Sequence, residues 1–342
     1  MPFSRENRLP PVISSMLRCA LLIIIILACI GLTTFGWRHP GGRELAQPRD
    51  PGRADRLKQH VIALSDDIGD RSVFEYAQLA RAEAYITERF NDLGYSVEKQ
   101  TYSVYNRPVS NIIAHRRGET APDEIVIIGA HYDTCFNPGA NDNASGVAAL
   151  LELAGMAADM RSGRTIRFIA FVNEEPPFFK TEAMGSLVYA RRARANNEDI
   201  RAAIILEMIG YYCTRPFSQR YPMLIGPFFP NRADFIAVVS NFANRELVRT
   251  VHSAFAAGSD MPIESASLFD FIPGVDFSDH WSFWQYDYPA VMVTDTAFYR
   301  YKHYHRETDT FEKLDYRTMA AVVDGLSGVL NHLAQVHPDD DD

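Results

Sequence analysis

The feature that most constrains the fold is an uninterrupted run of β-branched residues in the middle of the chain. Residues 125–128 read Ile-Val-Ile-Ile. A strand of this composition is typical of a sheet that helices cover on both faces, so that neither face of the strand meets water. We therefore expect a central strand over 124–130, and we expect ligands to bind beyond its carboxyl end.

Other apolar strands alternate with segments of helical spacing on both sides of this run. The further strands are expected over 97–104, 111–115, 165–173, 200–208, 223–225, 235–239 and 290–294. The helices are expected over 54–64, 79–93, 146–160, 182–195, 243–256 and 316–336. This alternation predicts an α/β fold: a three-layer α/β/α sandwich around a central mixed, largely parallel sheet.

The amino-terminal region predicts a membrane anchor ahead of this fold. The apolar run over 17–37 is long enough to cross a bilayer as one transmembrane helix. Arg5, Arg8 and Arg18 favour a cytoplasmic position for residues 1–16, so the domain after the apolar run is expected to be extracytoplasmic, in the periplasm or outside the cell. A cleaved signal peptide and a lipid anchor at Cys29 are open alternatives.

The remaining boundaries follow from composition. A Pro- and Gly-containing linker is expected over 38–53, one domain over 54–336, and a solvated acidic tail over 337–342.

The formal charge of −9 provides no broad positive field, so a nucleic-acid partner is not expected. Four cysteines are too few for a disulfide scaffold, and the sequence leaves open whether Cys135 and Cys213 pair.

Side chains that can bind metals recur where the predicted strands end. His131 and Asp133 follow the central strand two residues apart, so their side chains point the same way and Asp133 can orient the imidazole ring. The other members of the set are found at a helix entrance, after two further strands and near the carboxyl terminus: Asp142, Glu174, Glu175, Glu207 and His305. Each alone has an ordinary structural explanation, such as a helix cap or a solvated surface. Glu207 is harder to explain in this way, because it stands among apolar residues and needs a buried partner.

Together these residues resemble the co-catalytic zinc exopeptidases, the family that includes bacterial leucyl aminopeptidases and glutaminyl cyclases. The likeness runs from about residue 111 to residue 310. It rests on elements that stand here in the family's order: His131-x-Asp133, Asn141-Asp142, Glu174-Glu175, Glu207 before Met-Ile-Gly, Ser278-Asp279-His280, and His305 four residues before Asp309-Thr310.

The resemblance implies a centre of two Zn²⁺ ions. His131, Asp142 and Glu207 would hold one ion, and Asp142, Glu175 and His305 the other, with Asp142 as the bridge. Charge arithmetic agrees, because three carboxylates and one hydroxide balance two divalent ions. Glu174 is expected to act as general base, and Asp133, which would hold the His131 ring, is the second residue expected to take part in catalysis. Asp279, His280 and Asp309 are expected to support the ligands, and Tyr299, Tyr301 or Tyr304 to line the substrate pocket.

The expected function is zinc-dependent hydrolysis of peptide bonds by an aminopeptidase, with a peptide as the binding partner. Three alternatives remain open: a glutaminyl-peptide cyclotransferase on the same scaffold, a non-catalytic binding ectodomain, and an exopeptidase of carboxypeptidase-like or dipeptidase specificity. The sequence determines neither the preferred side chain of the substrate nor the oligomeric state.

Overall fold

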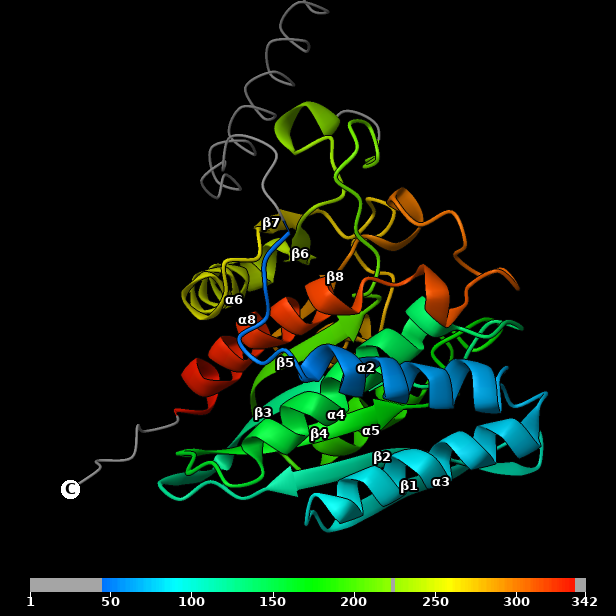
Figure 1. The fold of residues 1–342 in the computed structure, drawn as a ribbon. Coiled ribbons are helices and arrows are strands. Elements are labelled where there is room, and N and C mark those ends of the chain that lie inside the picture. Colours follow the sequence, from blue (N-terminus) through cyan, green and yellow to red (C-terminus); the bar gives the residue numbers. More distant parts are fainter. Residues whose placement is uncertain (1–44, 223–224, 336–342) are drawn as a thin grey trace, which may run out of the picture. The chain divides into compact units, whose positions relative to one another are not determined.

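A computed structural model describes residues 45–222 and 225–335 of the chain (Figure 1). Their centre is one eight-stranded sheet with the order β1-β2-β4-β3-β5-β8-β6-β7. The strands are β1 (Val97–Val104), β2 (Arg107–Arg116), β3 (Ala121–His131), β4 (Arg164–Phe171), β5 (Asp199–Glu207), β6 (Ile236–Asn241), β7 (Ile263–Leu268) and β8 (Ala290–Thr294).

The middle of the sheet is parallel. β3 pairs in parallel with β4 on one side and with β5 on the other, and β5 pairs in parallel with β8. The β1–β2 hairpin and the β2–β4 and β6–β8 pairs are antiparallel, so the sheet is mixed. Because β4, β3 and β5 are parallel neighbours, their carboxyl ends lie side by side at one edge of the sheet.

Helices cover both faces of this sheet. They are α2 (Arg53–Ile62), which continues into the π-helical turn η1 (Ala63–Ile68), α3 (Tyr76–Asp92), α4 (Gly146–Ala157), α5 (Gly185–Ala195), α6 (Arg245–Gly258), α7 (His280–Trp284) and α8 (Tyr316–Ala334). In Figure 1, α2 and α4 lie in front of the strands. Shorter helical turns are η2 (Ala140–Ser145), η3 (Gly226–Phe228), η4 (Phe242–Asn244), η5 (Ala297–Tyr299) and η6 (Phe311–Lys313).

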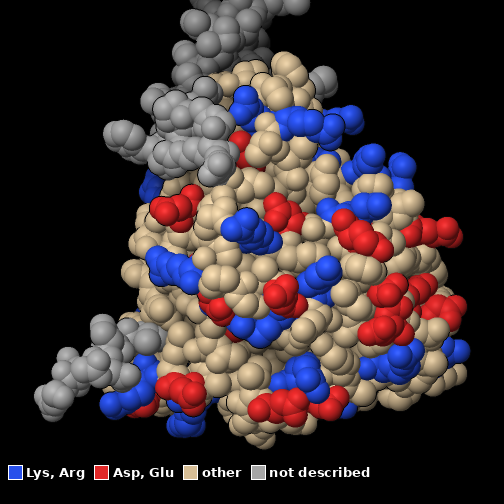
Figure 2. Space-filling view, viewed as in Figure 1, with Lys and Arg blue, Asp and Glu red and all other residues tan. Residues whose placement is uncertain are grey.

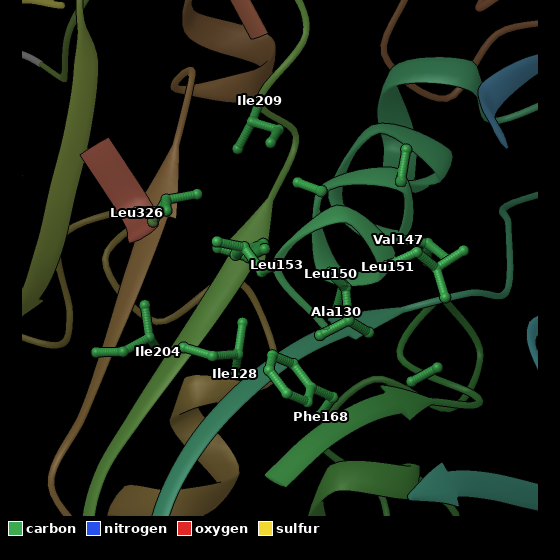
Figure 3. Close-up of a cluster of buried hydrophobic side chains, with 14 of the residues drawn as sticks. Ile128, Ala130, Val147, Leu150, Leu151, Leu153, Phe168, Ile204, Ile209 and Leu326 are labelled. Carbon is green, nitrogen blue, oxygen red and sulfur yellow. The ribbon is translucent and has the colours of Figure 1, made fainter. Parts of the chain in front are cut away.

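The burial of both faces of β3 confirms the prediction that its apolar run forms a central strand. Ile128 lies opposite Phe168 of β4 and Ile204 of β5, and these side chains pack in the larger core beneath α4 and α8 (Figure 3). The preceding residue, Ile127, points to the other face and joins a second core that includes Phe283 of α7. The predicted α/β fold with a largely parallel sheet is thus confirmed.

Several elements differ from the prediction. The sequence analysis missed β7, an edge strand whose polar residues Glu264, Ser265 and Ser267 hide its alternation. It also missed α7, which at five residues is too short to show helical periodicity. Of the strand predicted over 223–225, residues 223 and 224 lie outside the described residues, and Ile225 leads into η3.

The predicted cytoplasmic segment over 1–16, the transmembrane helix over 17–37 and the acidic tail over 337–342 all lie outside the described residues. Within the described ranges, none of the helices combines the length and the apolar character needed to span a membrane. The anchor and the extracytoplasmic location therefore stay predictions. On the face shown in Figure 2, basic and acidic side chains are interspersed over the surface.

The close packing of α6 on α8 generates a first prediction. A Cβ atom added to Gly325 of α8 would lie 2.4 Å from the ring of Phe255 on α6, which is fully buried. We expect Gly325→Ala to lower the free energy of unfolding by about 1–3 kcal/mol through overpacking. Urea-induced unfolding measures this change.

The matched control is Gly155→Ala in α4, whose added Cβ would meet only Leu93, at an ordinary 3.5 Å. We expect this variant to keep or raise the stability, since alanine favours a helix over glycine by up to about 1 kcal/mol. Equal unfolding midpoints for Gly325→Ala and the parent would contradict the described packing of α6 on α8.

Candidate metal centre

Three adjacent parallel strands each deliver an acidic or imidazole side chain to the same edge of the sheet. His131 is the last residue of β3, Glu207 is the last residue of β5, and Glu174 follows β4. The Nε2 atom of His131 lies 3.3 Å from Oε2 of Glu207 and 4.0 Å from Oε2 of Glu174. Oδ1 of Asp142, which belongs to η2, lies 3.4 Å from the same nitrogen.

A second group forms around the other oxygen of Asp142. The Nε2 atom of His305 lies 3.1 Å from Oδ2 of Asp142 and 3.1 Å from Oε2 of Glu175. His305 comes from the loop between η5 and η6, and its backbone is left-handed, with φ 54°. Asp142 therefore stands between two imidazoles and turns one oxygen to each.

The donor atoms fit two divalent cations. Among the described residues, Nε2 of His131 and His305, Oδ2 of Asp142 and Oε1 of Glu175 are buried without a hydrogen-bond partner. Buried polar atoms left in this way are costly unless another ligand satisfies them. A tetrahedral zinc ion with bonds of about 2.0–2.2 Å separates its donors by about 3.4 Å, close to the distances between the imidazole nitrogens and the carboxylate oxygens.

Electrostatics also favour cations at this edge. Burial, with the nearby Asp142 carboxylate, raises the pKa of Glu175 to about 8, and burial raises the pKa of Glu174 well above its ordinary value. Burial opposes ionisation of Asp142 too, but the imidazoles of His131 and His305 hold its pKa below the ordinary range. The carboxylates thus compete for positive charge, which bound cations would supply to all of them at once.

Two further predicted residues hold the cluster through backbone N–H groups. The carboxylate of Asp133 accepts hydrogen bonds from the N–H groups of Glu174 and Glu175, both at 3.1 Å. Its Oδ1 atom is 3.7 Å from Nδ1 of His131, whereas its backbone carbonyl oxygen is only 3.2 Å from that nitrogen. Asp133 therefore contacts His131 mainly through its main chain, and its side chain positions the two glutamates.

Asp309 performs the corresponding task for Asp142. Its carboxylate accepts hydrogen bonds from the N–H groups of Asn141 at 2.9 Å and Asp142 at 3.1 Å. The hydroxyl of Tyr301 donates to the same carboxylate at 2.7 Å. These hydrogen bonds hold the start of η2 in place.

The sequence analysis assigned no role to the polar neighbours of Asp142, although they tie η2 to the end of β5. Asn143 donates to the carbonyl oxygen of Leu206 and accepts from the N–H of Met208. In the same way Asn141 accepts from Gly210, and Ser145 accepts from Ile209. The signal in the sequence was the run Asn141-Asp142-Asn143-Ala144-Ser145, of which only the aspartate was interpreted as functional.

The Ser-Asp-His segment makes its contact through a residue that was not predicted. Ser278 donates a hydrogen bond of 2.7 Å to Oε2 of Glu207. Asp279 is fully buried, and burial raises its pKa to about 7. The Nε2 atom of His280 bonds the carbonyl oxygen of Val275 at 2.8 Å and its ring meets Trp284 edge-on, so neither contact joins it to a predicted ligand.

Arg71 is a buried support that sequence reasoning missed. Its side chain is fully buried and donates to backbone carbonyl oxygens of the surrounding loops: those of Leu64, Gly69, Tyr132, Pro138 and Gly139. These bonds fasten the segment between β3 and η2, which carries Asp133 and leads to Asp142. A lone arginine in a loop gives no sequence signal for such a role.

The three candidate tyrosines separate by their contacts. The hydroxyl of Tyr299 donates to the carbonyl oxygen of Pro273 at 2.9 Å, and that of Tyr301 is bound to Asp309. The ring of Tyr304 stacks on His305, with 3.8 Å between ring centroids. Tyr299, Tyr304 and Glu207 all line a neighbouring cavity whose mouth is open to solvent.

This cavity is mainly apolar. Its walls include side chains from β6, β7, β8 and the loops around them: Phe229, Phe235, Leu268, Ile272, Met292 and Phe298. The cavity thus adjoins the metal-binding residues through Glu207.

Comparison with known proteins agrees with this architecture. The chain is 40% identical over 297 residues to the uncharacterized protein YfbL of Escherichia coli (strain K12), covering 83% of this chain and 90% of YfbL. Its fold is similar to that of BSAP, a zinc aminopeptidase from Bacillus subtilis, with a TM-score of 0.65, 17% identity and coverage of 88% of this chain and 98% of BSAP. It is also similar to the fold of Fimbriiglobus ruber glutaminyl cyclase, with a TM-score of 0.61, 20% identity and coverage of 88% and 100%.

Most of the fungal relatives that the chain matches are longer, and the chain spans about half of their length. The profile of the peptidase family M28 matches residues 111–330, which hold every predicted metal ligand. The chain therefore belongs to peptidase family M28.

Proposed function

We propose that this protein is a zinc-dependent aminopeptidase with two metal ions in its centre. The observation that carries the proposal is the convergence of His131, Asp142, Glu175, Glu207 and His305 at one edge of the sheet. Several of their buried donor atoms have no hydrogen-bond partner among the described residues. Membership of a peptidase family and the similarity to the fold of a zinc aminopeptidase support it.

Glu174 is the general base in this proposal. Its carboxylate is farther from His131 than the carboxylates of Asp142 and Glu207. It lies close enough to His131 and Glu175 to share a cation with them, and we assign it to the attacking water instead. The bound zinc ions would supply Lewis acidity to the scissile carbonyl group and to the attacking water. Glu174 takes the proton of that water and returns it to the departing amine.

We assign the apolar cavity to the side chain of the first substrate residue. Glu207 lines the cavity and belongs to the metal-binding group, so a residue held there would place its carbonyl group near the cations. Tyr299 and Tyr304 both line this cavity, and we assign Tyr304 to the reacting end of the substrate because its ring stacks on His305. The hydroxyl of Tyr301 is bound to Asp309 instead. A large apolar first residue fits these walls best.

The general-base assignment predicts the behaviour of Glu174→Gln. We expect kcat/KM for a peptide substrate to fall at least about 100-fold, because the amide cannot accept a proton. The zinc content, measured by atomic emission, should stay at that of the parent. Glu182→Gln, at an exposed glutamate of the same segment, is the control and should keep full activity.

Two results would overturn this assignment. Undiminished turnover by Glu174→Gln would remove Glu174 from the reaction. Loss of zinc together with activity would make Glu174 a ligand instead.

Metal removal tests the centre itself. We expect a chelator to abolish turnover and to lower Tm by about 5 °C or more, because a ligand of the folded state at a hundred times its Kd stabilises it by about 2.7 kcal/mol. Added zinc should restore both. Differential scanning fluorimetry and an activity assay measure the two effects. An unchanged Tm, with no turnover before chelation, would favour a non-catalytic binding protein.

The cavity predicts substrate preference. We expect kcat/KM for leucyl- and phenylalanyl-nitroanilide to exceed that for alanyl-nitroanilide by about tenfold or more, since burying a large apolar side chain contributes about 1.5–3 kcal/mol. N-acetylated leucyl-nitroanilide, which lacks a free amine, is the control and should not be cleaved.

The same panel should include a peptide that begins with Gln, because a glutaminyl cyclase shares the fold. Cyclisation of this peptide with release of ammonia, while the nitroanilides stay intact, would replace the aminopeptidase proposal by the cyclase alternative.

A further inference from the structure

We propose that Cys135 is a ligand of the second cation, beside Asp142, Glu175 and His305. The inference rests on the metal centre of the proposed function and adds a sulfur donor to it. The sequence analysis considered Cys135 only as a possible disulfide partner of Cys213, but both thiols are free.

The position of Cys135 follows from the loop that carries it. Cys135 stands two residues after Asp133, in the segment that Arg71 fastens between β3 and η2. Its backbone carbonyl accepts a hydrogen bond of 2.8 Å from the side chain of Asn137. These contacts place the residue beside the edge of the sheet where the metal-binding side chains meet.

The donor atoms lie close enough to share one ion. Sγ of Cys135, a carboxylate oxygen of Glu175 and a ring nitrogen of His305 all lie within 4.8 Å of one another. Tetrahedral zinc with a bond to sulfur of about 2.3 Å would separate that sulfur from a nitrogen ligand by about 3.6 Å. Rotation of the Cys135 side chain would bring the set to that geometry.

A buried oxygen of Glu175 without a hydrogen-bond partner in the described part of the chain also indicates that a cation binds at this position. Its side chain is only 5% exposed, and among the described residues its Oε1 atom has no hydrogen-bond partner. The Nε2 atom of His305 likewise lacks one. The thiol therefore lies beside buried donors that a cation would satisfy.

A sulfur ligand would make the two cation positions unlike each other. The second position would have four protein donors, from Cys135, Asp142, Glu175 and His305, and so would be closed. The first would have three, from His131, Asp142 and Glu207, and would keep an open place for substrate or water. The charges of three carboxylates and one thiolate would balance two divalent ions, and the thiolate would favour zinc or cadmium over magnesium or manganese.

Cadmium titration tests the proposal in the full chain. The metal-free protein takes up to two equivalents of Cd²⁺, and the ultraviolet absorption of a cadmium–thiolate bond is recorded at each addition. We expect the parent and Glu174→Gln to show this band, and Cys135→Ser to lose it and to bind the second equivalent at least about tenfold more weakly. Cys213→Ser is the matched control and should keep the band.

Alkylation of the unmutated protein gives a second measurement that does not depend on the folding of a variant. Iodoacetamide should modify Cys135 in the metal-free chain, and two equivalents of zinc should protect it, as read by peptide mass mapping. Two bound cadmium ions without the thiolate band, a band that survives in Cys135→Ser, or alkylation of Cys135 that zinc does not slow would each overturn the proposal.

The outcomes separate this inference from the proposed function. A thiolate band without aminopeptidase turnover would leave Cys135 as a ligand and remove the enzyme assignment. Turnover with two bound cadmium ions and no thiolate band would support the aminopeptidase assignment and overturn the assignment of Cys135 as a ligand. Failure of the chain to bind a second equivalent would overturn the sulfur ligand together with the two-metal centre.

Discussion

The mutual repulsion of buried carboxylates is the constraint on which the rest of this structure depends. Asp142, Glu174, Glu175 and Glu207 are almost fully buried at one edge of the sheet, and the imidazoles of His131 and His305 stand among them. Such a group is unfavourable in a folded protein unless cations compensate it. The parallel order of β4, β3 and β5 nevertheless brings these side chains together, which is why the edge is best understood as a metal centre.

The residues around this centre act mostly on the backbone. Asp133 and Asp309 accept hydrogen bonds from the N–H groups of the residues that carry the donors, and Arg71 binds loop carbonyl oxygens. Asn143 links the η2 loop to the end of β5. Hydrogen bonds between these side chains and the backbone therefore hold in place the segments that carry the predicted ligands.

Much of the fold was predictable because its signals are local. The β-branched run of β3 and the apolar spacing of the helices are properties of short segments, and the order of strand ends then placed His131, Glu174 and Glu207 at one edge. The other features depend on contacts between distant segments. The hydrogen bond of Ser278 to Glu207, the loop bonds of Arg71 and the turning away of His280 could not be read from spacing. The edge strand β7 was not predicted because its polar residues interrupt the alternation of apolar and polar residues.

The apolar cavity has a consequence for how such an enzyme can diverge. Most of its walls come from β6, β7, β8 and their loops, whereas the metal-binding residues come from β3, β4, β5, η2 and one later loop. Among the described residues, Glu207 belongs to the predicted ligands and also lines the cavity, and Tyr304 lines the cavity and stacks on His305. Substitutions in β6, β7, β8 and their loops can therefore change substrate preference. The predicted ligands, and with them the reaction, can stay the same.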